Sequence, residues 1–266
     1  MKEFTVACIQ HGVVPMNPEA NIARSIALLQ TAMDEHHPDL VVFPETITTG
    51  FHPNMPKADF WKLLPPVPGS WTEPMQREAE RHGVYVVWPI WEQGPEGLIY
   101  NTSVLIAPDG QIAGLYSKTH PFPAEREYTT AGSEAPVFDL PFAKLGMVIC
   151  YDGDFPELVR AMALKGAEVV VRPAALLRDY EIWSLTNRAR AYDNQIHFVA
   201  VNSVGPDAAG NYYFGHSMIV DPCARILALA RAGDQIISAR LSPETVKESL
   251  VQHIPDRNTA SYAGIE

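Results

Sequence analysis

The sequence predicts one α/β domain in which mixed β-sheets carry helices on their outer faces. Short apolar runs typical of buried strands alternate with amphipathic segments typical of helices along the chain. The two halves of the chain also share one order of strands, helices and a hairpin, and no linker or change in composition separates them. We therefore expect residues 1–266 to form a single domain.

The first half of the chain supplies strands, two helices and a hairpin. Asn17-Pro18 opens a helix, because asparagine caps helix N-termini and proline is tolerated in the first turn. A second helix is expected at about 71–82, after a proline-rich loop. Pro108-Asp109-Gly110 is typical of a hairpin turn. Strands are expected at the short apolar runs 4–10, 40–43, 85–88, 100–106 and 112–116.

The second half repeats this pattern. A helix is expected after Pro156, with Asp154 and Glu157 at the spacing of a capping box. Another helix is expected at about 179–193, and Pro243 should begin a short one. Strands are expected at 145–149, 167–171, 197–201, 214–220, 225–228 and 235–239.

Composition excludes several classes of protein. The hydrophobic content of 47% and charged content of 19% are typical of a globular chain. A formal net charge of −11 argues against a nucleic-acid or anionic-membrane surface, since phosphate binding needs a basic patch. No apolar run is long enough to span a membrane, and we expect no signal peptide. The three cysteines form no CxxC pair, so we expect neither a zinc site nor disulfides, and a cytoplasmic location.

Cys150 follows the apolar run 145–149 at a predicted strand–turn–helix junction. A side chain at such a junction lies at the carboxyl end of a sheet, beside free backbone N–H groups and a helix N-terminus. That setting can lower a thiol pKa and stabilise an oxyanion. The alternative is a buried structural cysteine, because free cysteine is among the most buried residue types.

Two further polar residues follow predicted strands. Glu45 comes after the run 40–43, and Lys118 comes after 112–116 and before a segment fixed by prolines. The ordinary interpretation of Glu45 is a solvated loop glutamate, and that of Lys118 is a surface lysine. Together with Cys150 they offer a carboxylate, an ammonium and a thiol. A thiol that attacks a carbonyl needs a base for its proton and a cation for the oxyanion.

At these positions the chain resembles the nitrilase, or carbon–nitrogen hydrolase, superfamily. The resemblance rests on VVFPET around Glu45, YSKTHPF around Lys118 and GMVICYDGDFPE around Cys150, in the right order, with FGHS following at 214–217. It implies a four-layer α-β-β-α sandwich without a metal or organic cofactor. It also implies that Glu45 is the general base, Lys118 stabilises the oxyanion and Cys150 forms a thioester. The backbone N–H of Tyr151 would complete the oxyanion hole.

The resemblance implies a second glutamate as well. Glu125, seven residues after Lys118, falls where that residue is expected, and Glu127 is the competing assignment. Five residues near the motifs are predicted to line the substrate pocket. They are Phe51, Asp152, Pro173, Ala174 and Phe214.

The motifs also indicate a branch of the superfamily. True nitrilases usually have Trp-Glu or Gly-Glu after the cysteine, whereas Tyr151-Asp152 resembles the amide hydrolases. CYDGDFPE at 150–157, GAEVVVR at 166–172 and YFGHS at 213–217 echo aliphatic amidases and formamidases. ω-Amidase-like members typically read CYDxRF, and here Gly153-Asp154 replaces the arginine end of that pattern.

We therefore expect an enzyme that hydrolyses a small linear carboxamide to the acid and ammonia. An ω-amidase or an N-carbamoyl amidohydrolase is the nearest alternative, and a catalytically inactive binding protein on the same fold is a further one. The expected partners are the amide substrate and a second copy of the chain in a homodimer or larger homo-oligomer.

Overall fold

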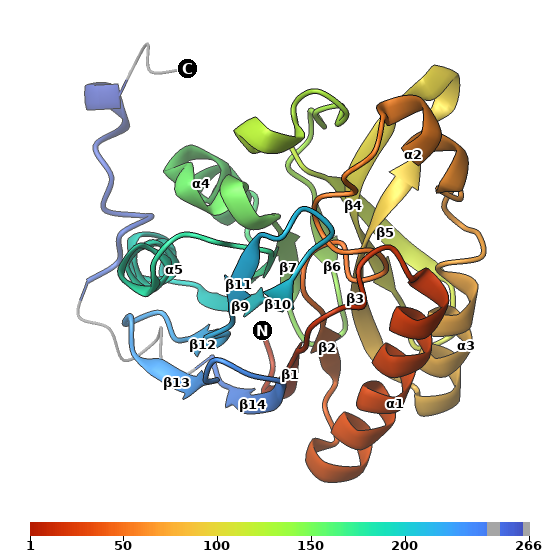
Figure 1. Cartoon of the computed structure of the whole chain (residues 1–266). Helices are drawn as coiled ribbons and strands as arrows, with labels where there is room; N and C mark the ends of the chain where they lie inside the picture. The colour runs from red at the N-terminus through yellow and green to blue at the C-terminus, as the bar shows by residue number, and fades with distance from the viewer. Residues whose placement is uncertain (244–250, 263–266) are drawn as a thin grey trace.

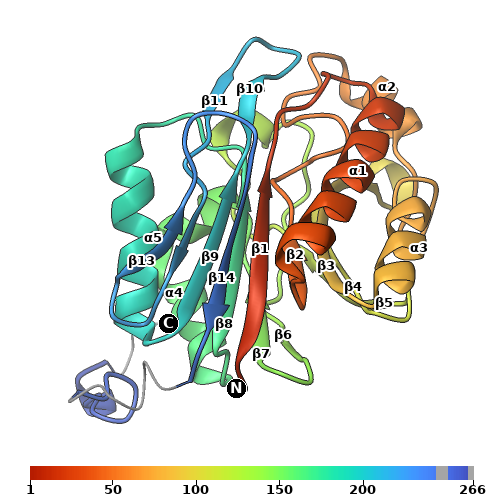
Figure 2. The same cartoon turned by 90° about the horizontal axis from the view of Figure 1, so that it is seen from below.

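The computed structural model describes residues 1–243 and 251–262, and it confirms the four-layer α-β-β-α sandwich. Two six-stranded sheets lie face to face in the middle, and helices cover their outer faces (Figure 1; Figure 2). In the order of their pairing, the first sheet contains β14 (Gln235–Leu241), β1 (Phe4–Gln10), β2 (Leu40–Val42), β3 (Tyr85–Gln93), β4 (Ile99–Ile106) and β5 (Ile112–Ser117). The second contains β13 (Ile226–Leu229), β12 (Met218–Val220), β9 (His197–Asn202), β8 (Val169–Ala174), β7 (Lys144–Met147) and β6 (Val137–Asp139).

Helices lie on both outer sides of this pair of sheets. Figure 2 shows α1 and α3 beside the first sheet and α4 and α5 beside the second. No helix in the described ranges is long and apolar enough to cross a membrane. The helices are α1 (Pro18–His36), α2 (Lys57–Leu63), α3 (Glu73–His82), α4 (Pro156–Leu164) and α5 (Tyr180–Asn194). A separate hairpin pairs β10 (Val204–Pro206) with β11 (Tyr212–Phe214).

Strand β1 shows why the layers hold together. Successive side chains of a strand point to opposite faces of its sheet. Val6 and Cys8 accordingly pack in the core between the two sheets, while Ala7 and Ile9 pack in the core under α1 and α3. Such a strand is apolar on both faces, which explains its continuous apolar run.

Most predicted elements form where the sequence placed them. The strand at 4–10 and the hairpin strands at about 100–106 and 112–116 are confirmed, and Asn17 accepts a capping hydrogen bond from the N–H of Ala20. The helix expected at Pro243 falls on residues outside the described ranges. The sequence analysis missed the short elements α2, β6 and β10, and the strand expected at 214–220 is interrupted, because β11 ends at Phe214 and β12 begins at Met218.

The expected capping box of α4 is wrong. The N-cap of α4 is Phe155, with no side-chain capping bond, and Pro156 stands in the first turn. Asp154 instead forms ion pairs with Arg172 and Arg178, which lie on β8 and just beyond it. Buried or half-buried guanidinium groups compete for this carboxylate more strongly than an exposed helix end does.

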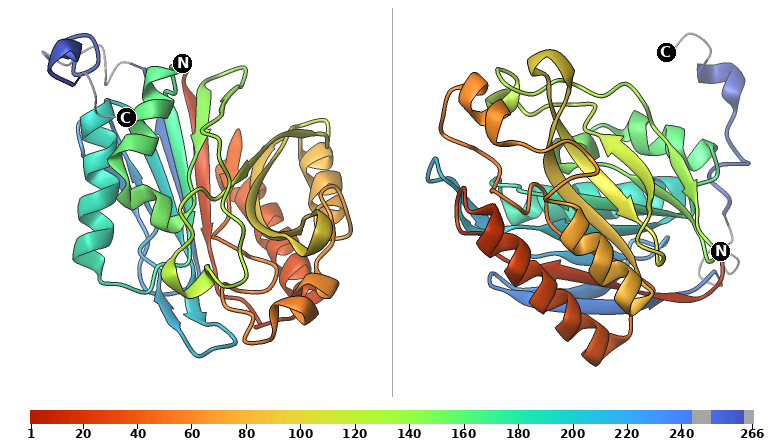
Figure 3. Two further views of the ribbon diagram at one scale, coloured as in Figure 1. Left: turned by 90° about the horizontal axis from the view of Figure 1, so that it is seen from above. Right: turned by 90° about the vertical axis from the view of Figure 1, so that its right-hand side faces the viewer.

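The topology brings the predicted site residues to one edge of the sandwich. Strands β2 and β3 run parallel, as do β7, β8 and β9, so the carboxyl ends within each set lie at one edge. Glu45 follows β2, Lys118 directly follows β5, and Cys150 follows β7 at the start of a 3-10 turn, Cys150–Asp154. The described C-terminal segment, 251–262, lies instead at the end of the molecule where the N-terminus lies (Figure 3).

Two buried histidines predict a fall in stability in mild acid. His11 is fully buried and His197 is almost so, and burial lowers the pKa of each to about 4. Because the unfolded histidine binds its proton near pH 6.5, stability is complete above that pH and falls as the pH drops toward 4. Each histidine should cost about 2 kcal/mol at pH 5 relative to pH 8. We expect His197→Gln, measured by urea unfolding at both pH values, to reduce this difference by about half. An unchanged pH dependence in the variant would contradict the assignment to His197.

Candidate active site

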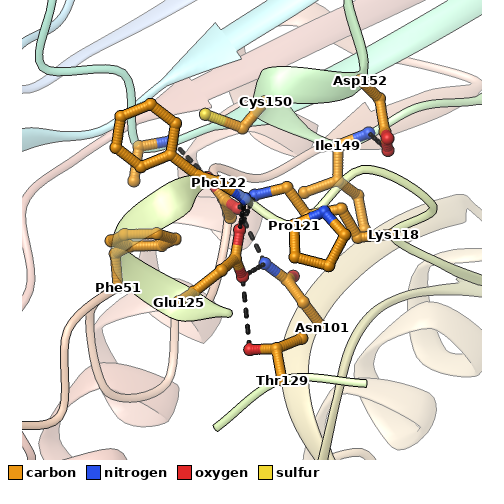
Figure 4. A network of polar contacts seen from close by, with 12 residues as sticks. Phe51, Asn101, Lys118, Pro121, Phe122, Glu125, Thr129, Ile149, Cys150 and Asp152 are labelled. Atoms are coloured by element: carbon orange, nitrogen blue, oxygen red, sulfur yellow. Dashed lines mark hydrogen bonds and ion pairs between the residues drawn. The ribbon is translucent and has the colours of Figure 1, made fainter. Parts of the chain in front are cut away.

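A buried lysine between two glutamates forms the centre of the site. Lys118 Nζ donates a hydrogen bond to Glu45 Oε1 at 2.8 Å and a second to Glu125 Oε1. All three side chains are inaccessible to solvent. Figure 4 shows Lys118 and Glu125 meeting in this cluster, with Cys150 above it. The structure therefore brings Glu45, Lys118 and Glu125 together, whereas Glu127 is exposed.

Fixed hydrogen-bond donors orient both carboxylates. Asn101 Nδ2 lies 2.7 Å from Glu45 Oε1 and 3.3 Å from Glu125 Oε2. The Ala175 N–H donates to Glu45 Oε2 at 2.8 Å, and the Phe122 N–H donates to Glu125 Oε1 at 2.8 Å. Asn101 lies near the start of β4. Because β4 is antiparallel to β3, the first residues of β4 lie beside the carboxyl end of β3, at the edge of the sheet that carries the site. Neither carboxylate can rotate without losing several bonds.

The cluster is held by its opposite charges. Burial alone would lower the pKa of Lys118, but the carboxylates of Glu125 and Glu45 raise it well above its ordinary value. Burial raises the pKa of Glu125, the Lys118 ammonium lowers it, and the Glu45 charge raises it further, so that the net shift is upward. Lys118 therefore stays a cation, so that an ammonium group is held between the two carboxylates in a dry environment. In the described residues, no group of three or more His, Cys, Asp or Glu side chains is arranged to hold a metal ion.

Cys150 sits on a strained turn that a buried arginine supports. Its φ angle is 48°, in the left-handed region that non-glycine residues rarely occupy and that clusters at functional sites. Arg172 Nε donates to the Cys150 carbonyl at 2.7 Å, and its Nη1 donates to Asn187 at 2.7 Å on α5. Gly153 is required here, because a Cβ atom at this residue would lie 2.2 Å from Arg172 Nε.

The thiol of Cys150 is neutral in this setting. Burial raises its pKa and the Glu45 carboxylate adds to the rise, while Lys118, Arg172 and the Ala175 N–H oppose it. The pKa of the Cys150 thiol is raised overall, because burial outweighs the local dipoles. This corrects the expectation that the strand–turn–helix setting lowers it. A neutral thiol needs a base within reach to become a nucleophile. Glu45 is the carboxylate whose charge acts on the thiol, which makes it the candidate base.

Asp152 lies behind the site and does not line the pocket. Its fully buried carboxylate accepts hydrogen bonds from the Tyr116 hydroxyl at 2.7 Å, the His120 N–H at 2.8 Å and the Ile149 N–H at 3.0 Å. The Thr119 hydroxyl donates to it as well. Asp152 thus ties the segment after Lys118 to the segment before Cys150. The pocket prediction for Asp152 is corrected to this structural position.

The pocket beside Cys150 is small and mostly apolar. It holds about 290 Å³ of space including its open mouth. Among the five predicted pocket residues, Phe51 lies in its wall, and its ring faces Lys118 Nζ at 5.3 Å. The wall consists of Phe51, Phe122, Cys150, Tyr151, Ala175, Leu176, Leu177 and Arg178.

Three other predicted pocket residues are absent from this wall. Pro173 and Ala174 still belong to β8 and are buried in the sheet, so the chain reaches the pocket one residue later, at Ala175. Phe214 pairs with Val204 in the β10–β11 hairpin. The sequence analysis missed Asn101. Its only indication in the sequence was the presence of a polar residue inside the predicted strand 100–106.

The family model described as carbon-nitrogen hydrolase matches residues 5–249. The chain belongs to this family. A carbon–nitrogen hydrolase is an enzyme that acts on C–N bonds, and the four-layer fold and the predicted family agree with the match.

Relatives within the family include named amidases. The chain is 32% identical to the 2-oxoglutaramate amidase of Bacillus subtilis, over 93% of this chain and 95% of the relative. It is 32% identical to a formamidase of Bacillus cereus, over 92% of this chain and 76% of the relative. The crystal structure of Saccharomyces cerevisiae Nit3, from branch 10 of the nitrilase superfamily, superposes with a TM-score of 0.83 at 31% identity, covering 92% of each chain.

Proposed function

We propose that this carbon–nitrogen hydrolase cleaves a linear carboxamide to a carboxylic acid and ammonia through a thioester on Cys150. The observation that carries the proposal is the buried Lys118 held by Glu45 and Glu125 next to a neutral thiol at the wall of a small pocket. The names of the B. subtilis and B. cereus relatives, both amidases, support the same reaction class. Because the contributing strands come from both sheets, we also propose that the chain acts as one catalytic domain.

The first half of the reaction forms the thioester. Glu45 takes the thiol proton as the sulfur of Cys150 attacks the amide carbon. The negative charge moves to the carbonyl oxygen, where the Lys118 ammonium and the Tyr151 N–H stabilise it. Glu45 then gives its proton to the nitrogen, the C–N bond breaks, and ammonia leaves the acyl group on the sulfur.

The second half releases the acid. Glu45 takes a proton from water, and the resulting hydroxide attacks the thioester carbon. A second oxyanion forms on the same donors. When the C–S bond breaks, the leaving thiolate recovers the proton from Glu45, and the enzyme returns to its starting state.

Ammonia release from a substrate panel tests the proposal. The panel contains short amides, ω-amides, N-carbamoyl compounds and the nitriles matched to the short amides. We expect amides to be hydrolysed and nitriles to be poor substrates, because attack on an amide places the negative charge on an oxygen that the Lys118 ammonium and the Tyr151 N–H stabilise, whereas attack on a nitrile places it first on a nitrogen. Faster ammonia release from a nitrile than from every amide would overturn the branch assignment. Lack of turnover together with lack of a thioester adduct on Cys150 would favour an inactive binding protein.

Glu125→Gln is expected to lower kcat while KM changes little. The amide keeps the shape of the carboxylate and can still accept from the Phe122 N–H, but it removes one of the two charges that hold Lys118. Displacement of the ammonium from the oxyanion should cost about 10²-fold or more in kcat. Steady-state kinetics on the best amide of the panel measure the effect. Glu127→Gln, at an exposed residue, is the matched control and should behave as the wild type. Equal losses in both variants would contradict the assignment of Glu125.

A further inference from the structure

A buried aspartate joins two loops that are far apart in the chain. Asp207 lies in the loop between β10 and β11 and is only 4% exposed. Its Oδ2 accepts a hydrogen bond at 3.2 Å from the backbone N–H of His52, which is 155 residues earlier in the chain. In the same early loop, Asn54 Nδ2 donates to the Ala208 carbonyl at 3.2 Å. Figure 2 shows the β10–β11 hairpin beside the orange segment between β2 and α2. The hairpin therefore holds the segment 50–54.

This segment carries Phe51, a residue of the pocket wall. The ring of Phe51 lies 5.3 Å from Lys118 Nζ, beside the charged cluster (Figure 4). Hydrogen bonds fix the backbone on both sides of the ring. Before it, Trp91 Nε1 donates to the Gly50 carbonyl at 3.2 Å, and after it the N–H of His52 donates to the buried aspartate. The position of this part of the wall thus depends on contacts that lie outside the pocket.

A second buried aspartate shows which contacts a hairpin turn of this kind needs. Asp221 lies in the β12–β13 turn and is 1% exposed. Asp207 and Asp221 each accept through Oδ1 from the N–H groups two and four residues later. These distances are 3.0 and 3.0 Å in the first turn and 2.8 and 2.9 Å in the second. One carboxylate oxygen is therefore sufficient to close the turn.

The two aspartates differ in what their second oxygen binds. Oδ2 of Asp221 stays within its own turn, where it pairs with Arg225 Nε at 2.6 Å. Oδ2 of Asp207 accepts from Asn211 Nδ2 at 2.9 Å and from the Tyr213 hydroxyl at 2.6 Å, both in the hairpin, and from His52. Burial raises the pKa of Tyr213 and its hydrogen bond to Asp207 adds to the rise, so the hydroxyl stays protonated and donates. These donors orient the oxygen that holds the other loop.

We infer that Asp207 is a positioning residue, which holds the segment 50–54 so that Phe51 stays in the pocket wall beside Lys118. This inference rests on the proposed function and adds to it a residue that selects substrates by the shape of their acyl chain. A wall residue on a loop keeps its place only where its backbone is fixed by further contacts. Asp207 acts through Phe51 and does not itself line the pocket.

Asp207→Asn removes the contact between the loops and leaves the turn intact. Its amide oxygen can still accept from the N–H groups at 209 and 211, and the Tyr213 hydroxyl can accept from the new NH₂ group. The N–H of His52 can only donate, so it loses its acceptor. Asp221→Asn is the matched control, because within residues 1–243 and 251–262 no hydrogen bond of Asp221 reaches the segment 50–54. Thermal melting should show both variants folded.

Hydrogen exchange measures the contact without turnover. A lost bond to a carboxylate should speed amide exchange in the segment 50–54 of Asp207→Asn by about 10-fold or more, with no change in Asp221→Asn. Unchanged exchange of this segment in Asp207→Asn would overturn the inference.

Two amides that differ only in width measure the effect on the pocket. 3,3-Dimethylbutyramide carries two more methyl groups than butyramide on the acyl chain. Once Phe51 can move, the branched chain gains room and the straight chain loses contact with the wall. The ratio of kcat/KM, straight over branched, should fall by about 10-fold in Asp207→Asn, mainly through KM, and stay unchanged in Asp221→Asn. A purely structural role would lower both substrates equally, so an unchanged ratio would overturn the positioning role.

Two further variants complete the test. Phe51→Ala should lower the ratio as Asp207→Asn does, and the double variant should add little, because both changes act on one wall; full additivity would contradict the inference. Asn54→Gly removes the weaker contact between the same loops at an exposed residue, and glycine suits the φ angle of 52° there. It should change both readouts in the same direction by a smaller factor. Absence of turnover on every amide, together with faster exchange in Asp207→Asn, would end the proposed function but support Asp207 as the residue that holds the segment.

Discussion

Cys150→Ala is expected to abolish amide hydrolysis while the protein stays folded. The change removes one sulfur atom from a residue at the pocket wall, so its cost in unfolding free energy should be about 1 kcal/mol. Without the thiol no thioester forms, and the oxyanion donors alone cannot replace a nucleophile. We expect kcat to fall by at least about 10³-fold, judged from nucleophile removal in other covalent hydrolases. Ammonia release and thermal melting measure the two effects.

A second buried cysteine supplies the matched control. Cys8 lies in β1 in the core between the sheets, and burial raises the pKa of its thiol too. Cys8→Ala should cost a similar amount of stability but retain full turnover. Mass spectrometry after rapid quenching should show the acyl adduct in the wild type and in Cys8→Ala, and not in Cys150→Ala. Turnover by Cys150→Ala at the rate of the control would rule out the thioester mechanism.

The parts of the fold that depend on local sequence were predictable. The β1 strand, the cap at Asn17 and the hairpin turn at Pro108-Asp109-Gly110 each follow from a few neighbouring residues. The strand-end positions of Glu45 and Lys118 were likewise visible as polar residues after apolar runs. Their convergence was not, because it depends on which strands pair and on how the two sheets face each other. Resemblance to the family supplied that step, and the topology agrees with it.

The remaining features of the site depend on contacts between distant residues. Asp154 had a capping spacing to Glu157, yet arginines at 172 and 178 take its carboxylate. The thiol pKa depends on competition between burial and dipoles, and burial cannot be computed from a sequence window. Arg178 is separated from Cys150 by the helix α4 and the strand β8. The motif around the cysteine therefore does not predict that Arg178 lies in the same pocket wall. Local patterns thus predicted the groups that we propose to react, and tertiary packing determined their charge states and neighbours.

Lys118→Met is expected to inactivate the enzyme and also to destabilise it strongly at neutral pH. The variant keeps the length of the side chain but leaves Glu45 and Glu125 facing each other in a dry cluster without their cation. Removing one member of a buried ion pair typically costs about 3–5 kcal/mol. The oxyanion also loses its charged donor, so kcat should fall by about 10²-fold or more. Urea unfolding and kinetics measure these two losses.

The pH dependence of the variant follows from the same contacts. Burial already raises the pKa of Glu125, and Lys118 is the cation that opposes the rise. Without it, the carboxyl pair should bind a proton more tightly in the folded than in the unfolded protein, where a glutamate pKa is near 4.3. Stability gained by that proton is present at low pH and is lost as the pH rises through the folded-state pKa. Lys118→Met should therefore be closer in stability to the wild type at pH 5 than at pH 8.

A double variant separates the charge effect from the loss of packing. Glu45→Gln added to Lys118→Met removes one of the two facing carboxylates, and the new amide can still accept from the Ala175 N–H. We expect the double variant to recover much of the stability lost at pH 8 and to lose most of the added pH dependence, while remaining inactive. If the double variant is no more stable than Lys118→Met at pH 8, repulsion between the two carboxylates does not cause the instability of Lys118→Met. Activity restored in the double variant would show that neither the ammonium nor the carboxylate takes part in the reaction.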